Sequence, residues 1–445
     1  MKNKFLFSAT ILIFLTRMPV LAQETVGELR LSLAEAREFA IQHNRMVTSA
    51  KLDMEASKMA VWEAVSAGLP QVVTSGSFTD NLKQMVFLIP DFIGGDPNRK
   101  IPITMGSQYS TSLSLQASMP LFSAPYIVGI ETTKLARRIT ETSYKSTELD
   151  VQEAVSSIYY LILISEESLK ILEWNLANLQ EVLLSTKTMY NVGMAESTDV
   201  DQMASNVTMM ENSKSSLERT IEMNYNLLRF QLGVSSDTRI VLSNTLEDLA
   251  REINIDALLT QEFDHRENVG YRLAEGQEKM AYMNLKSQKA QVLPTLSGVI
   301  STTKTGMGDT LSMMGWYNSS LVGLQLSIPL FASGNKYAKI KKARINLEKA
   351  INQKEMVTDQ LKLQEKQLRY NLVNANTQYK NQKDNVEVSR RVYTSMENKY
   401  KQGMASSLDL TQANQQYLQA ENNYISSLMN LLQTKLALDK LLNNM

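Results

Sequence analysis

The chain has 445 residues and no cysteine, and its 46 Lys and Arg residues balance its 46 Asp and Glu residues. The lack of cysteine excludes a disulfide framework and a thiolate metal site. The charge balance, without any basic block, argues against nucleic acid or an anionic lipid surface as the main partner.

The first residues have the pattern of a secretion signal. Lys2 and Lys4 precede an apolar run over residues 5–15, and the sequence Val20-Leu21-Ala22 provides a small-residue cleavage site. A membrane anchor is the competing interpretation, but a spanning helix needs roughly 20 apolar residues. We therefore expect residues 1–22 to be a signal peptide that directs export.

The first clear strand lies at residues 108–119, where apolar and polar side chains alternate almost completely. One face is apolar and the other consists of Ser and Gln; the apolar face holds Tyr109, Leu113, Leu115, Ala117 and Met119. Residues 72–79 alternate more weakly, and we predict them to be the partner strand because they precede the better one.

A very long helix is predicted over residues 126–190. No proline lies between Pro125 and Pro294, and a helix of this length would reach roughly 100 Å at 1.5 Å per residue. Such a rod is about three bilayers long, so it must stand outside the membrane. Residues spaced by three and four predict a coiled-coil seam along it: Leu169, Leu172, Leu176, Leu179, Leu183, Thr186 and Tyr190.

A glycine turn follows this helix and occurs twice in the chain. The stretch 190–199 returns as 400–409, with Tyr, Gly-Met-Ala, Ser and Asp in register. Each copy lies between long runs without Gly or Pro, which predicts two helical hairpins. We expect Ser197 and Ser407 to be the N-caps of the second helices, with Asp199 and Asp409 in the first turn, where an acid favours the helix dipole.

The repetition extends beyond the turns, which favours two tandem units over 23–234 and 235–445. Ser-x-Pro-Leu-Phe at 118–122 returns at 327–331, and the strands return at 295–302 and 322–328 with Leu324 on the apolar face. Each unit is predicted as helix, strand, loop, strand, long helix, glycine turn and helix. Prolines are expected at the strand–helix junctions: Pro70, Pro120, Pro294 and Pro329. A second seam is expected at Leu372, Ala375, Tyr379, Gln382, Val386, Ser389, Tyr393, Met396 and Tyr400.

Four strands per chain are too few to close a membrane barrel, so the chain is expected to oligomerise. Two chains would supply about 8 strands with a filled interior, and three would supply about 12, enough to leave a lumen. The polar strand face favours the water-filled trimer. The connections 80–106 and 304–316 are then external loops, and the helices extend into the periplasm.

These residues resemble the TolC-like outer-membrane efflux proteins over essentially the whole mature chain. The specific signals are the two Ser-x-Pro-Leu-Phe segments, the doubled glycine turn and an opening Leu31-Ser-Leu-Ala-Glu-Ala36 with Ala40 and Asn44, although Arg45 stands where the family usually has Pro. The resemblance implies a homotrimer with a 12-stranded β-barrel in outer-membrane lipid and a long α-helical barrel in the periplasm. It also implies a periplasmic adaptor and an inner-membrane pump of the RND, ABC or MFS type, serving efflux or type I secretion of small molecules or proteins.

The resemblance also implies roles for residues at the turns. Six match the family's helix tips, where adaptor hairpins dock: Val192, Gly193, Met194, Gln402, Gly403 and Met404. Thr198, Asp199 and Tyr400 match positions whose hydrogen bonds hold the family's entrance closed, and Ala405 stands where many relatives carry Arg. Asp409 matches an acidic ring at the entrance, whose second position is Gln412 here.

Other functions fit the residues less well. A passive coiled-coil scaffold of the envelope without a continuous pore would explain the helical seams, and glycine ends helices whether or not anything docks there. An enzyme is not expected, and neither a cofactor nor a metal is expected. His43 and His265 are the only histidines, and no His-x-x-His pair or Gly-rich phosphate loop lies near them.

Overall fold

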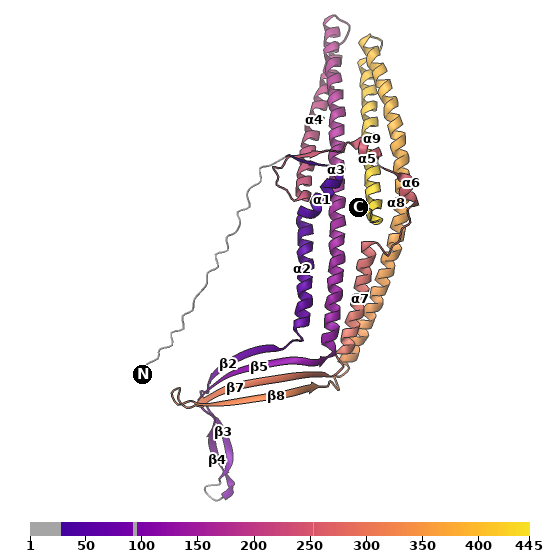
Figure 1. The fold of residues 1–445 in the computed structure, drawn as a ribbon. Coiled ribbons are helices and arrows are strands. Elements are labelled where there is room, and N and C mark those ends of the chain that lie inside the picture. Colours follow the sequence, from indigo (N-terminus) through magenta and orange to yellow (C-terminus); the bar gives the residue numbers. More distant parts are fainter. Residues whose placement is uncertain (1–27, 92–95, 252) are drawn as a thin grey trace.

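The computed structural model describes residues 28–91, 96–251 and 253–445, so the expected signal peptide lies outside the described part of the chain. A long bundle of helices is joined at one end to a β-sheet (Figure 1). The predicted combination of a mainly helical protein with a separate β part is therefore confirmed.

Among its described residues, the first half of the chain has four helices: α1 (Leu33–His43), α2 (Arg45–Ser66), α3 (Ala124–Asn191) and α4 (Ser197–Leu232). Asn44 separates the first two without a proline. Its carboxamide oxygen accepts hydrogen bonds from the main-chain N–H groups of Met46 and Val47. Asn44 is thus the C-cap of one helix and the N-cap of the next.

Helix α3 has 68 residues, which corresponds to roughly 100 Å. Ser123 caps its start by accepting a hydrogen bond from the N–H of Tyr126 at 3.3 Å, and Pro125 lies in the first turn, where its missing N–H needs no partner. The predicted helix over 126–190 is confirmed within two residues at either end.

The second half also runs from shorter helices through strands to a long helix and a final helix. It contains α5 (Leu246–Arg251), α6 (Ile255–Thr260), α7 (Val269–Ala290), α8 (Asn335–Lys401) and α9 (Ser407–Leu441). Helices α3 and α8 run the length of the bundle (Figure 1). Helices α2 and α4 follow one another along α3, while α7 and α9 follow one another along α8.

The largest apolar core lies at mid-height, where α1, α3, α4 and α9 meet. Two short strands, β1 (Leu29–Leu31) and β6 (Ile240–Leu242), pair in parallel beside it. The hydroxyl of Tyr159 donates to the carbonyl of Leu31 at 3.1 Å and so ties this pair to α3. Three-residue strands give almost no sequence pattern, and this pair was not predicted.

Both predicted seams are largely confirmed. Leu179 and Thr186 on α3, and Leu372 and Tyr400 on α8, are buried. Tyr190 is the exception, because its side chain is 48% exposed in the single chain. The seam of α3 therefore ends one turn earlier than the spacing predicted.

Four strands form one antiparallel sheet in the order β2-β5-β7-β8. Their bounds are β2 (Gln71–Asp80), β5 (Tyr109–Ser123), β7 (Thr295–Gly308) and β8 (Gly315–Ser327). Leu115 opposes Thr302, and Leu324 opposes Gly298, which itself opposes Met119. Because opposed residues share a face, Leu115 and Leu324 lie on the same face, as the alternation predicted.

The connections differ from the prediction. The segment 80–106, expected to be a loop, holds a hairpin of β3 (Met85–Asp91) and β4 (Asp96–Met105). Most of 304–316 is also strand, since β7 and β8 extend into it. Both faces of the hairpin are rich in apolar residues, so no alternation revealed it.

Pro120 also lies elsewhere than expected. It is inside β5, at a register shift opposite β7, and not at the strand–helix junction. A proline cannot donate to the ladder, and a bulge leaves a residue unpaired. Pro70 and Pro294 immediately precede β2 and β7, and Pro329 follows β8, as predicted.

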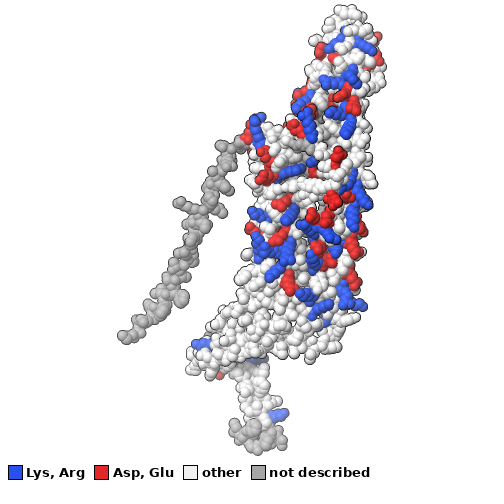
Figure 2. Space-filling model, turned by 45° about the vertical axis from the view of Figure 1, so that its right-hand side comes forward, with Lys and Arg blue, Asp and Glu red and all other residues white. Residues whose placement is uncertain are grey.

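Charge separates the helices from the sheet. Lys, Arg, Asp and Glu cover the helical bundle on the face drawn in Figure 2, whereas the sheet region is almost free of them. Between its ends the sheet carries one charged residue, Lys304 of β7, whose ammonium lies 5.3 Å from the ring centre of Trp316. None of the helices in the described part of the chain is long and apolar enough to cross a membrane.

Candidate functional site

The two glycine turns lie at the end of the bundle farthest from the sheet (Figure 1). Gly193 and Gly403 have φ angles of 75° and 74°, the left-handed region that glycine adopts without a steric penalty. In each turn the glycine N–H bonds to the carbonyl three residues back, and the following N–H bonds to the carbonyl five residues back. These are Schellman motifs, as the predicted turns require.

The residues expected to dock an adaptor are all exposed on these turns. Met194 and Met404 are 77% and 66% exposed, and no atom outside the turns lies within 4 Å of where a Cβ on Gly193 or Gly403 would stand. The remaining four are also exposed: Val192, Gly193, Gln402 and Gly403. The tips thus present two adjacent small surfaces with an apolar methionine on each.

The N-caps of α4 and α9 are Glu196 and Ser406, so the prediction of Ser197 and Ser407 was wrong by one residue. Each helix has a capping box, in which the carboxylate three residues after the cap accepts the N–H of the cap residue. Asp199 accepts from Glu196 N and Asp409 from Ser406 N, both at 3.1 Å. The helix-start role of both aspartates is therefore confirmed.

Asp409 is an exposed carboxylate with a lowered pKa. The hydroxyl of Ser406 donates to its Oδ2 at 2.6 Å, and the main-chain N–H of Ser406 donates to the same oxygen. Both hydrogen bonds stabilise the ionised form and hold the pKa of Asp409 below its ordinary value. The carboxylate is accordingly charged at neutral pH.

Side chains of the two hairpins bond directly to each other near the tips. The Tyr400 hydroxyl lies 2.7 Å from Thr186 Oγ1 in a buried position, and Ser407 Oγ donates to Asp199 Oδ1. We call these four residues the inter-hairpin latch. They join α3 to α8 and the start of α4 to the start of α9.

Two further contacts lie beside the latch. The Lys401 ammonium lies 3.0 Å from a carboxylate oxygen of Glu181. Its hydrogen bonds to Glu181 and Glu397 raise the pKa of Lys401 above its ordinary value. Deeper in the bundle, the Asn206 side-chain N–H group donates to Thr411 Oγ1 at 3.3 Å. The two hairpins are therefore held together by polar groups over several turns.

Of the residues predicted for gating, Asp199 and Tyr400 belong to the latch, whereas Thr198 bonds locally to the Glu196 side chain at 3.2 Å. Ala405, at the expected Arg position, packs beside the apolar cluster around Tyr400. Sequence reasoning did not find Thr186 and Ser407 as the partners of the latch. Only their spacing from the turns could have indicated them, because Ser and Thr are common on every face of these helices.

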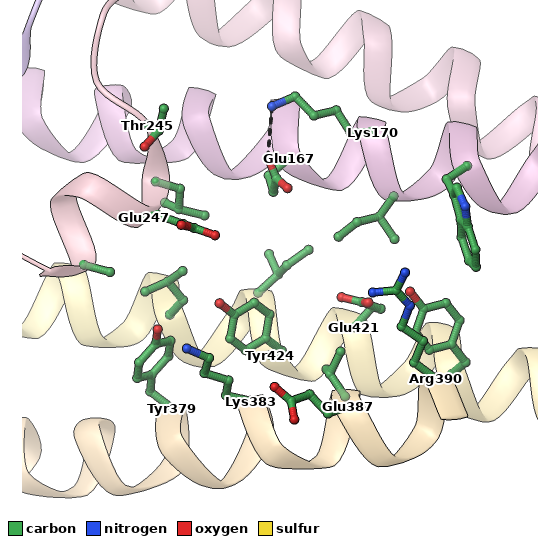
Figure 3. Close-up of a pocket in the computed structure, with 18 of the residues that line it drawn as sticks. Glu167, Lys170, Thr245, Glu247, Tyr379, Lys383, Glu387, Arg390, Glu421 and Tyr424 are labelled. Atoms are coloured by element: carbon green, nitrogen blue, oxygen red, sulfur yellow. Dashed lines mark hydrogen bonds and ion pairs between the residues drawn. The ribbon is translucent and has the colours of Figure 1, made fainter. Parts of the chain in front are cut away.

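A groove of about 820 Å³ lies between α3 and α8 at mid-height, beside α9 and α5 (Figure 3). Its tip-side end is the contact of Arg390 with the Trp174 ring, 5.7 Å from the guanidinium carbon to the ring centre. Four acidic and four basic residues line it, so its charges cancel: Glu167, Glu247, Glu387, Glu421, Lys170, Arg251, Lys383 and Arg390. No cluster of three potential metal-binding side chains occurs in the described residues, and the groove favours no single ligand class.

Comparison with known proteins identifies relatives of the whole arrangement. A family model described as outer membrane efflux protein matches residues 37–234 and 272–444. The outer membrane protein TolC of Vibrio cholerae is 22% identical over 322 residues, which cover 70% of this chain and 68% of that protein. The probable efflux pump outer membrane protein TtgC of Pseudomonas putida is 23% identical over 372 residues, covering 78% and 73%.

A solved structure has the same fold. The outer membrane protein VceC of Vibrio cholerae superposes with a TM-score of 0.71 at 15% identity, over 92% of this chain and 95% of that chain. The agreement extends over both the helical bundle and the sheet.

Proposed function

Because this chain belongs to the outer membrane efflux protein family, we propose that three copies form the exit duct of a tripartite efflux system. The duct carries small molecules from an inner-membrane pump, through a periplasmic adaptor, to the outside of the cell. The protein is located in the outer membrane, with its helices extending into the periplasm.

The observation that carries this proposal is a hydroxyl-lined face of the sheet. Ser75, Ser114, Thr303 and Ser319 oppose one another across all four strands. Ser114 Oγ and Thr303 Oγ1 lie 3.0 Å apart, and on the same face Ser77 Oγ lies 2.8 Å from Ser112 Oγ. A row of hydroxyls across a sheet suits a face that water covers. A face packed against other side chains or against lipid would not need such a row.

The opposite face supports contact with lipid near the helices. Ala117, Ile300 and Val322 oppose one another there, and Met119 and Leu324 lie one row closer to the helices. Farther from the helices this face becomes mixed, with Thr302 and Ser320 hydrogen-bonded to each other at 3.0 Å. The two faces therefore differ most in the rows nearest the bundle.

The free edges of the sheet support assembly into a trimer. Strands β2 and β8 have a neighbour on one side only, and unpaired edges invite pairing with another chain. Pairing β8 of one copy with β2 of the next in a ring of three yields a closed barrel of about 12 strands, wide enough for a lumen.

The tips are proposed to contact the adaptor and the latch to control the entrance. The docking surface is formed by residues of the two turns: Val192, Gly193, Met194, Gln402, Gly403 and Met404. The residues proposed to act in gating are Thr198, Asp199, Tyr400 and Asp409. Asp199 and Tyr400 act there through the latch. Breaking the latch lets the two hairpins move apart and widens the entrance.

The proposal is tested by single-channel recording of the purified protein in a planar bilayer. A duct produces discrete ion-conducting steps, and Tyr400→Phe, which lacks the latch hydroxyl, produces larger steps than the unaltered protein. A passive coiled-coil scaffold, the alternative function, inserts without conducting. Absence of conductance from both proteins would reject the duct.

A further inference from the structure

The β3–β4 hairpin carries an apolar surface that this chain leaves uncovered. In its register Phe87 opposes Ile103, and Met85 opposes Met105. Because opposed residues share a face and alternate residues follow them, one face is wholly apolar: Met85, Phe87, Ile89, Ile101, Ile103 and Met105. Phe87 is 45% and Met105 63% exposed.

This surface lies beyond the part of the sheet that a membrane would cover. A strand tilted in a bilayer needs about 9–11 residues to span it, and β2, β5, β7 and β8 have 10, 15, 14 and 13 residues. The hairpin continues from the end of the sheet remote from the helices (Figure 1). Its apolar face therefore extends past the hydrocarbon, and lipid chains do not cover it.

The hairpin leaves the sheet in a defined direction. Asp309, in the turn between β7 and β8, accepts hydrogen bonds at 3.2 Å from the Gln84 side chain and from the main-chain N–H of Gln108. The Asn81 N–H donates to the Gln108 carbonyl at 2.7 Å, and Gly106 turns the chain with a φ of 115°. The turn of the β7–β8 hairpin thus holds the base of the β3–β4 hairpin in place.

The position of the hairpin points to its partner. It connects β2 to β5, and β2 is a free edge of the sheet, where the proposed trimer joins the next copy. A two-stranded hairpin is marginally stable by itself. No charged residue occurs in 84–90 or 101–108, so copies of these segments do not repel one another when brought together.

From this geometry we infer that the three β3–β4 hairpins of the proposed trimer pack against one another through their apolar faces and form a collar that narrows the outer mouth of the duct. The inference rests on the proposed function, because it needs three copies around one axis. The surface that each hairpin recognises is a second copy of this chain.

The absence of cysteine allows a direct test by crosslinking. Ile103→Cys and Met105→Cys place a thiol on the apolar face, and Thr104→Cys places an exposed thiol on the opposite face of the same strand. After oxidation in outer membranes, the first two variants should give covalent dimers under denaturing conditions. The Thr104 variant should remain monomeric under the same denaturing conditions.

Conductance provides the second measurement. Phe87→Ser with Ile103→Ser should weaken the collar and shift single-channel conductance upward, whereas Val86→Ser with Thr104→Ser, on the opposite face, should leave it unchanged. Trimer formation is checked for each variant by mass in detergent. Conducting trimers without crosslinks at Ile103 or Met105, or labelling of these cysteines by a lipid-soluble photoprobe, would overturn the collar while leaving the duct intact. Failure to form any conducting trimer would instead overturn the proposed function, and the collar with it.

Discussion

Thr186 and Tyr400 form the most buried part of the latch. Thr186 Oγ1 donates to the Val182 carbonyl at 2.8 Å, which leaves it to accept from the Tyr400 hydroxyl. Tyr400 is only 5% exposed, so its hydroxyl has little access to water. The energetic consequence of breaking this pair depends on which partner is removed.

We predict that Thr186→Val destabilises the protein by about 1–3 kcal/mol, because it leaves the buried Tyr400 hydroxyl unpaired, whereas Tyr400→Phe costs about 1 kcal/mol. Denaturant unfolding measures both, and the double variant should cost less than the sum. Thr188→Val is the matched control, since Thr188 is exposed and bonds only to its own helix at 3.0 Å. Equal destabilisation by Thr186→Val and Thr188→Val would contradict the latch.

Asp409 is both a helix-start residue and a candidate for an acidic ring. Three copies around one axis within a Debye length of roughly 8 Å would create a negative potential at a narrow entrance. Such a ring favours cations. We predict that Asp409→Asn lowers cation preference, measured as reversal potential in a salt gradient, more than Asp199→Asn does. Identical selectivity in the wild type and the Asp409 variant would restrict this residue to its capping role.

The same residue predicts a pH dependence. Because the pKa of Asp409 is lowered, its charge and its stabilising cap are present above the ordinary aspartate pKa of about 3.9 and are lost only as pH falls through the lower, folded-state value. Cation preference should therefore stay constant between pH 7 and pH 5. A change within that interval would assign the selectivity to another group.

At the scale of elements, the tips combine a turn that glycine adopts freely with an open surface. A residue with a side chain at Gly193 or Gly403 pays roughly 1–2 kcal/mol for the left-handed conformation, but it meets no atom outside the turn within 4 Å. Asparagine tolerates this conformation better than valine does. Comparing asparagine with valine at each glycine therefore distinguishes the effect of the turn conformation from the effect of the exposed surface.

We predict that Gly193→Val and Gly403→Val abolish efflux while leaving the trimer intact, because the distorted turns no longer fit the adaptor. The asparagine variants keep the turn, so loss of efflux there would indicate direct contact with the glycine itself. Efflux is assayed in cells and assembly by a trimer gel. Normal efflux in the double valine variant would exclude the tips as a docking site.

The sheet predicts opposite outcomes at neighbouring positions. Leu115→Arg or Leu324→Arg should cost about 2–4 kcal/mol if the residue faces lipid near the midplane. Gln116→Arg or Gln325→Arg, on the polar face, should assemble normally and alter conductance. Folding yield into membranes and single-channel recordings measure both effects. Similar losses of folding yield in the leucine and the glutamine variants would show that the assignment of faces is wrong.

At the scale of the whole molecule, contacts within one chain predict contacts between chains. The two turns are related by an offset of 210 residues, so the latch pair Asp199 and Ser407 corresponds to Asp409 and Ser197. Asp199 uses Oδ2 for its cap and Oδ1 for Ser407, while Asp409 uses Oδ2 for its own cap. If hairpins alternate around the ring, Asp409 Oδ1 accepts from Ser197 of the next chain.

Tyr190 supports the same arrangement. It corresponds to the buried Tyr400 but is exposed in the single chain, as expected of a residue that a neighbouring copy covers. We predict that Ser197→Cys with Asp409→Cys forms a disulfide between chains, whereas Asp199→Cys with Ser407→Cys forms one within a chain. Denaturing gels distinguish them by mass. A trimer whose 197/409 pair never crosslinks would contradict the alternation.

Local chemistry accounts for what could be predicted from the sequence. The α3 helix, 68 residues long, follows from the absence of proline after Pro125, and the turns follow from Gly193 and Gly403, which adopt a conformation that other residues resist. The shared face of Leu115 and Leu324 follows from the two-residue period of a strand. Each of these features depends on residues close together in the chain.

The remaining features depend on residues far apart, and only the tertiary structure decided them. Ser407 was expected to cap its own helix, but Ser406 caps it and leaves Ser407 free to bond to Asp199, 208 residues away. The β3–β4 hairpin has apolar residues on both faces, so its pattern matched no period, and pairing alone defines it. Nothing in the local sequence selects among the many possible distant partners, because short polar side chains and short apolar strands are compatible with most of them. Packing of the two hairpins and the register of the sheet make that selection.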